Sequence, residues 1–227
     1  MNSTYTPSPM MLAAEEAIEV SGILNNPYFQ RLRSGNMDKD TFLASQQQFF
    51  FAVKFFPRPM NILLARLPDP ADRLLILENV VEEHGCMNAS AFHVTTFKQF
   101  LMSLGAEGSV NPLGPEVTAF NHVLTTACAH DVFEKGVACM GVIERAFADI
   151  SAIIGRAVVS QGWVSEEKLL HYKLHAAIDR QHAEDFFSTI GAAWYDQGRQ
   201  QDIRDGLMLG LYAFNRLYDD MNAIALR

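Results

Sequence analysis

The segment of residues 171–185, HYKLHAAIDRQHAED, contains three histidines and three acids. At about 100° per residue on a helix, His175, Asp179 and His182 fall on one narrow stripe, and His171 lies on the same face one turn earlier. Apolar residues border this stripe, so the four side chains are expected at the packed side of the helix. Buried imidazoles and carboxylates need partners, and a shared metal ion would satisfy several at once. Hydrogen-bonded histidines without a metal are the alternative.

A second candidate is Glu144, which follows a run of uncharged residues, 136–143. An acid in such a helix is normally paired, neutralised or metal-bound. The neighbouring Arg145 faces about 100° away and is a poor partner within the helix. Glu144 is therefore predicted to bind a metal, with a salt bridge to another helix as the alternative.

A third group of candidates lies in ENVVEEHGCMNASAFH, which contains Glu82, Glu83, His84 and His93. Taken alone, this segment is a charged helix end closed by Gly85. Together with the other two segments it offers the mix of carboxylates and imidazoles used by non-haem iron and manganese sites in helical bundles. Zinc is less favoured, because its structural sites prefer four ligands and usually thiolates.

The elements that must position these residues are helical throughout. Helical periodicity dominates, proline and glycine separate the periodic segments, and no alternating strand pattern or repeat occurs. We expect an all-α bundle of about seven to eight helices, with Ser165 capping the helix that holds residues 171–185. The helical segments are 10–24, a short helix or turn in 25–36, 38–56, 60–67, 71–85, 92–104, 117–159 with a break near residue 130, the helix after 165, and 199–225; residues 105–116 form a loop.

Length and composition limit the class of protein. The chain has 227 residues, 49% of them hydrophobic, which fits a single domain spanning 1–227, with residues 1–8 expected to be flexible. A net charge of -8 disfavours nucleic acid and membrane partners and favours a small-molecule substrate. Three cysteines without a CxxC pair indicate reduced thiols, and no signal peptide or membrane span is found, so a cytoplasmic protein is expected.

These motifs resemble those of the haem-oxygenase-like di-iron oxidases, a superfamily related in fold to thiaminase-type proteins and pyrroloquinoline-quinone synthase. The resemblance covers residues 26–218. It rests on HxxxDxxH (His175, Asp179, His182), Glu144, NxxxE (Asn79, Glu83), HxxxFxxFxxxLG from His93 to Gly105, and FPRP at residues 56–59.

The resemblance implies two iron ions, with manganese as the alternative metal, and dioxygen as co-substrate. The implied ligands are Glu83, His93, Glu144, His175, Asp179 and His182. Glu82, His84 and His171 would be neighbours of the ligands or alternative ligands. The implied reaction is oxidation of a small, partly apolar substrate of the amino-acid or fatty-acid type, and relatives of this fold often form homodimers.

The sequence departs from this family in two places. Ten residues separate Glu83 from His93, three more than expected, so either the helix bulges or Glu82 or His84 takes a place in the site. In the branch that makes para-aminobenzoate, tyrosines and a lysine occur where this chain has the run 49–51 (Phe-Phe-Phe) and Ile154. That chemistry is therefore not supported by the residues, and a thiaminase-like role lacks a cysteine in a catalytic context.

A substrate pocket is expected beside the metal ligands. An aromatic run could form its wall, with plain core packing as the alternative; the run consists of Phe49, Phe50, Phe51, Phe55 and Phe56. Lys54 and Arg58 could meet a substrate carboxylate, with a surface position as the alternative. Two other functions remain open. One is a metal-free oxidase of the quinone-synthase kind, in which the histidines bind substrate and oxygen directly. The other is an interaction protein with the same fold.

Overall fold

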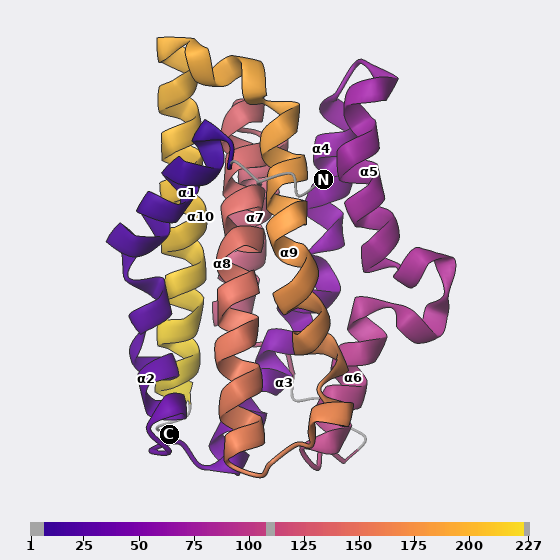
Figure 1. Ribbon diagram of the computed structural model, residues 1–227, viewed down its shortest axis with the longest axis vertical. Helices are drawn as coiled ribbons and strands as arrows, with labels where there is room; N and C mark the ends of the chain where they lie inside the picture. The colour runs from indigo at the N-terminus through magenta and orange to yellow at the C-terminus, as the bar shows by residue number, and fades with distance from the viewer. Residues whose placement is uncertain (1–6, 108–111, 225–227) are drawn as a thin grey trace, which may run out of the picture.

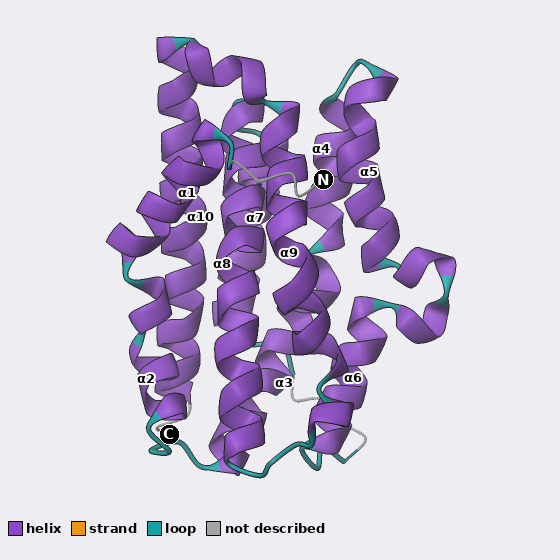
Figure 2. Cartoon of the chain, in the orientation of Figure 1, coloured by secondary structure: helices purple, strands orange, loops and turns teal. Residues whose placement is uncertain are grey.

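The computed structural model describes residues 7–107 and 112–224 and is helical throughout, as Figure 2 shows. Parts of the expected flexible N-terminus, of the expected loop and of the last expected helix (residues 1–6, 108–111 and 225) lie outside the described residues. The α-helices of the described residues are α1 Pro9–Ser21, α2 Pro27–Arg33, α3 Lys39–Phe55, α4 Pro57–Arg66, α5 Pro70–Glu83, α6 His93–Ser103, α7 Pro115–Ala129, α8 Phe133–Ser160, α9 Leu170–Thr189 and α10 Gln197–Ile224. The all-α prediction is confirmed, and the described residues form ten α-helices where about seven to eight were expected.

Proline sets the starts of several helices. Pro9, Pro27 and Pro70 occupy the first turn, where a missing N–H costs nothing, and Ser8, Asn26 and Asp69 cap them by accepting from backbone N–H groups. Ser8 also donates a hydrogen bond from Oγ to Glu184 Oε2 at 2.9 Å, which ties the start of α1 to α9.

The helix with the histidine stripe begins differently from the prediction. Ser165 precedes a 3-10 turn, Glu166–Lys168, and makes no side-chain cap. The helix α9 begins at Leu170, with Leu169 as an N-cap residue that has no side-chain hydrogen bond. The predicted cap was therefore wrong, because the acidic residues after Ser165 close a separate turn.

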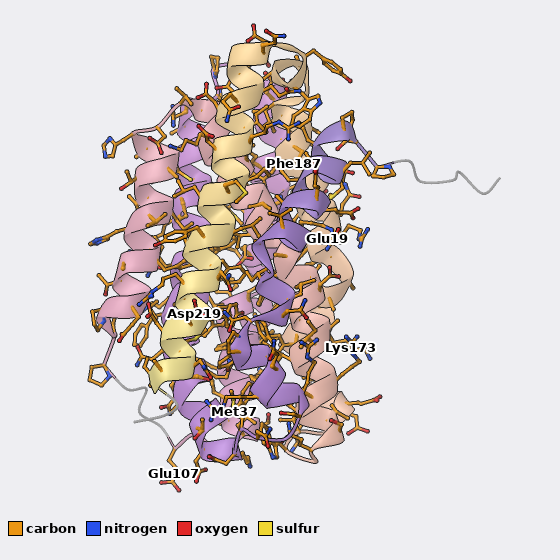
Figure 3. All side chains as sticks on the ribbon, turned by 90° about the vertical axis from the view of Figure 1, so that its left-hand side faces the viewer. Glu19, Met37, Glu107, Lys173, Phe187 and Asp219 are labelled. Carbon is orange, nitrogen blue, oxygen red and sulfur yellow. The ribbon has the colours of Figure 1, made fainter. Side chains whose placement is uncertain are left out.

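The long helix α8 lies at the centre, with α9 and α10 packed along it (Figure 1). Figure 3 shows α1 lying against α10 on one side of the molecule, with side chains filling the space between the ribbons. Close helix packing depends on Gly141 facing α9 and on Gly206 and Gly210 facing α8. A Cβ at Gly210 would lie 2.6 Å from the carbonyl oxygen of Cys139. Within the described residues, no helix is long and apolar enough to cross a membrane.

The segment between α5 and α6 leaves the bundle, at the right of Figure 1. It contains two 3-10 turns, Gly85–Met87 and Ala89–Ala91, and residues Gly85, Cys86 and Met87 have positive φ angles of 55°, 51° and 69°. Left-handed backbone of this kind is uncommon outside glycine and turns the chain sharply. The longer interval between Glu83 and His93 is thus accommodated by an excursion of the chain, and α5 ends at Glu83 without a bulge.

Candidate metal centre

The histidine stripe of α9 is buried. The exposed fractions are 0% for His171, 4% for His175, 0% for Asp179 and 2% for His182. The helical spacing predicts this shared inward face, and its neighbours on α5, α6 and α8 supply the remaining candidates.

The first group consists of Glu83, His93 and His175, whose ligand atoms all lie within 4.8 Å of one another. Glu83 and His93 are at the facing ends of α5 and α6, and Glu83 Oε1 lies 2.9 Å from His93 Nδ1. The excursion between these helices therefore returns the chain to a point where the two side chains meet.

The second group consists of Glu144, Asp179 and His182, whose ligand atoms also lie within 4.8 Å of one another. His182 Nδ1 is 3.8 Å from Glu144 Oε2 and 3.7 Å from Asp179 Oδ1, too far for hydrogen bonds. The two groups adjoin, because His175 Nδ1 lies 2.8 Å from Asp179 Oδ1.

The unpartnered atoms of these groups test whether a metal fits. Glu144 Oε1, His175 Nε2, Asp179 Oδ2 and His182 Nδ1 are buried and have no hydrogen-bond partner among the described residues. Leaving one such atom unsatisfied costs about 1–3 kcal/mol, more for a charged group. Carboxylate oxygens and imidazole nitrogens are also the ligand types that iron and manganese accept. The residues therefore fit one or more divalent metal ions.

In the second group, burial and neighbouring charges shift the pKa values of all three side chains. Burial, and then the Asp179 charge, raise the pKa of Glu144 to about 7. Burial also raises the pKa of Asp179 well above its usual value. Burial alone would lower the pKa of His182, but the carboxylates of Glu144, Asp179 and Glu82 outweigh it and raise that pKa to about 10. A divalent cation would stabilise the ionised carboxylates and displace the imidazole proton.

In the first group, burial and neighbouring charges shift the pKa values of Glu83 and His175 in a different way. Burial raises the pKa of Glu83, but the adjacent His93 outweighs it and holds that pKa below the ordinary value. Burial lowers the pKa of His175, which keeps its ring neutral and able to bind a metal through Nε2.

The three neighbouring candidates occupy different positions. Glu82 lies outside both groups, with Oε2 at 2.5 Å from His182 Nε2. The ring of His84 lies 2.7 Å from the Val80 carbonyl oxygen through Nδ1 and packs against Phe92, outside both groups. His171 is fully buried beside His175, and its burial lowers the pKa of its ring well below the ordinary value.

The position of Arg145 agrees with its helical angle. Its guanidinium pairs with Glu15 and Asp149, and points away from Glu144. Among the described residues, Glu144 on α8 has an ion-pair contact with His182 on α9, so the alternative of a salt bridge to another helix stands beside metal binding.

An apolar cavity of about 40 Å³ lies beside both groups. Besides Glu83, Glu144, His171 and His175, its lining consists of Phe49, Ala52, Val53, Phe56, Phe120, Ile143, Phe147 and Phe214. Of the predicted pocket residues, Phe49 and Phe56 line it, and Phe51 and Phe55 do not. Phe50 packs against Phe51 and Lys98, whereas Lys54 and Arg58 are exposed and lie outside the lining.

Several lining residues carried no sequence signal that separates them from ordinary core positions. Phe120, Phe147 and Phe214 come from α7, α8 and α10 and meet only in the folded chain. For Phe147, the available indication was that it lies one helical turn from the predicted ligand Glu144 and therefore on the same face of the helix.

The chain is similar in sequence to known proteins. The chain is 23% identical over 172 residues to a 4-aminobenzoate synthase of Chlamydia muridarum, covering 74% of this chain and 72% of that protein. It is 30% identical over 91 residues to a 4-aminobenzoate synthase of Chlamydia pneumoniae, covering 40% and 39%.

Solved structures share the fold at low identity. A CADD-like protein of unknown function from Nostoc punctiforme has a TM-score of 0.78 at 14% identity, covering 96% of this chain and 97% of that one. A domain with a heme oxygenase-like fold from Shewanella denitrificans has a TM-score of 0.78 at 15% identity, covering 96% and 94%. The family model for iron-containing redox enzymes matches residues 44–215. This chain belongs to that family of iron-containing redox enzymes.

Proposed function

We propose that the protein is a non-haem di-iron oxidase or oxygenase that uses dioxygen to oxidise a small, partly apolar substrate. The observation that carries the proposal is the pair of adjoining buried groups with unpartnered ligand atoms. Three of their residues, Glu83, Glu144 and His175, line a cavity whose wall is otherwise mostly apolar. Two adjoining groups favour two ions, since a single ion would leave one group unsatisfied.

Each group would hold one ion. Glu83, His93 and His175 would bind the first, and Glu144, Asp179 and His182 the second. Bound iron would supply the reducing electrons and coordination positions that dioxygen activation requires. The protein's own residues fix the ligands, and the apolar wall keeps bulk water from the reacting centre.

The lining favours an apolar part of the substrate near the metal groups, as in a fatty acid or an apolar amino acid. The proposal does not include 4-aminobenzoate formation. Phe49, Phe50 and Phe51 occupy the segment where the resemblance places tyrosines, and the fully buried Ile154 stands where it places a lysine.

Anaerobic loading with ferrous iron tests this function. Wild-type protein should bind close to two irons per chain and consume oxygen in the presence of a substrate from a panel of fatty acids and amino acids. The Asp179→Ala variant should bind about one iron and lose oxygen consumption, because a ligand of the second ion is removed.

His122→Ala is the matched control, since His122 is an exposed histidine of α7, and it should bind iron as wild type does. Folded wild-type protein that binds no iron would overturn the proposal. Oxygen consumption without iron would then identify the metal-free oxidase. Iron binding without oxygen consumption on any substrate would favour the interaction protein.

A further inference from the structure

The side chain of His171 is buried in aromatic surroundings next to the metal groups. Its exposed fraction is 0%, and its ring centroid lies 4.3 Å from that of His175 and 4.7 Å from that of Phe97. It belongs to neither group of ligand atoms, and no carboxylate among the described residues pairs with it. A buried imidazole without an acidic partner is stable in its neutral form, which has one N–H and one lone pair.

The hydroxyl of Thr96 fixes which nitrogen carries the hydrogen. Thr96 Oγ1 donates its one hydrogen to the His93 carbonyl oxygen at 3.0 Å. Toward His171 Nδ1, 3.4 Å away, the hydroxyl can therefore only accept. The tautomer that completes this arrangement carries the hydrogen of His171 on Nδ1 and the lone pair on Nε2.

The Nε2 atom of His171 is buried and has no hydrogen-bond partner among the described residues. His171 also lines the apolar cavity, together with Phe49, Phe147 and Phe214. Apart from the proposed metal ligands, the other described residues of the lining are apolar. Leaving a buried acceptor such as Nε2 without a hydrogen bond in this wall costs about 1–3 kcal/mol of free energy, unless a molecule in the cavity supplies a donor.

We propose that His171 Nε2 accepts a hydrogen bond from an O–H or N–H group of the substrate, so that the substrate is a slender apolar molecule with one such donor. The cavity of about 40 Å³ is far smaller than the about 150 Å³ cavity that takes up benzene, so it favours an alkyl chain over a ring. This inference rests on the proposed function only in placing the substrate in this cavity.

Two isomers, 1-butanol and diethyl ether, test the inference. They have the same molecular formula, but only 1-butanol has an O–H group that can donate a hydrogen bond. Ligand-observed NMR titration should show tighter binding of 1-butanol by about three- to tenfold, the usual range for one net hydrogen bond. In the His171→Phe variant this preference should fall several-fold, because an aromatic ring is kept and the His171 acceptor is lost, while Glu144 and His175 still offer acceptors in the lining. In His171→Gln it should be partly retained, because the amide oxygen can accept.

The control is His122→Phe, the same substitution at an exposed position of α7, which should keep the preference. An unchanged preference in a folded His171→Phe variant would overturn the inference, as would equal binding of the two isomers by wild type.

A second measurement needs no variant. In the nitrogen NMR spectrum of chelator-treated protein, His171 should have its hydrogen on Nδ1, and 1-butanol should shift the Nε2 signal more than diethyl ether does. A hydrogen on Nε2 would overturn the inference. Neither measurement requires iron, so failure of iron binding and failure of this inference are separate outcomes.

Discussion

At the scale of single residues, His182 lies between acids on both sides of its ring. Glu82 Oε2 is 2.5 Å from Nε2, and Nδ1 faces Glu144 and Asp179 at 3.8 and 3.7 Å. The hydrogen bond to Glu82 fixes the ring orientation and keeps the hydrogen on Nε2 when Nδ1 is free to bind a metal. Glu82 is therefore a positioning residue for His182.

Loss of Glu82 should weaken metal binding at the second group. We expect the Glu82→Ala variant to lose about 10- to 100-fold in affinity for its second iron, and Glu82→Gln to lose less because its amide oxygen still accepts. Iron titration under anaerobic conditions measures both. Glu78→Ala is the control one helical turn earlier on α5, where the side chain is exposed. Equal losses in Glu82→Ala and Glu78→Ala would contradict the positioning role.

At the scale of elements, the contact of α10 with α8 depends on small residues. Gly210 lies against the backbone of Cys139, and Gly206 lies against that of Lys135. Because backbone cannot move aside as a side chain can, any added Cβ must push the two helices apart.

We therefore expect Gly210→Ala to lower the free energy of unfolding by about 1–3 kcal/mol, as overpacked cores do. Gly198→Ala, at the start of the same helix, should be close to neutral, because its Cβ would meet a side-chain atom at an ordinary 3.5 Å. Denaturant unfolding of both variants measures the difference. Similar stability of the two variants would show that α10 can shift without cost.

The arrangement of the helices also explains which parts of the site could be predicted from the sequence and which could not. The inward stripe of α9 could be predicted because fixed helical geometry relates His175, Asp179 and His182. The meeting of Glu83 with His93 followed only from the family resemblance, since it depends on the path of the chain between two helices. The start of α9 was missed for a local reason, because the residues after Ser165 form a turn of their own. Part of the cavity wall was missed, because Phe120, Phe147 and Phe214 come from helices distant in sequence.

At the scale of the whole molecule, the metal groups concentrate buried ionisable side chains at the meeting point of α5, α6, α8 and α9. Burying these ionisable groups lowers the free energy of unfolding of the metal-free fold, and bound cations would remove this cost. For each occupied group, iron at about 100 times its dissociation constant should add about 2.7 kcal/mol to the free energy of unfolding. For a chain of this size that is a rise in Tm of roughly 5–10 °C, which differential scanning calorimetry under anaerobic conditions can measure. No rise on saturation would contradict binding at these groups.

The stabilisation of the fold by iron should also increase with pH. The pKa of His182 is raised to about 10, so its protonated form stabilises the metal-free fold below about pH 6.5, and this contribution is lost as the pH rises toward 10. Iron must displace that proton, and the affinity should rise about tenfold per pH unit for each proton released. Iron titrations at pH 6.5, 7.5 and 8.5 check the direction. An affinity that is constant or falls over this range would contradict the assignment of His182.

The excursion between α5 and α6 affects how the chain length can change within such a metal centre. Glu83 closes one helix and His93 opens the next, so residues can be inserted or deleted between them without changing the register of either helix. On α9 the same change would rotate His182 away from Asp179, because both belong to one continuous helix. Half of the centre is thus free to vary in chain length, and a signature with a fixed interval between its glutamate and histidine would exclude this chain.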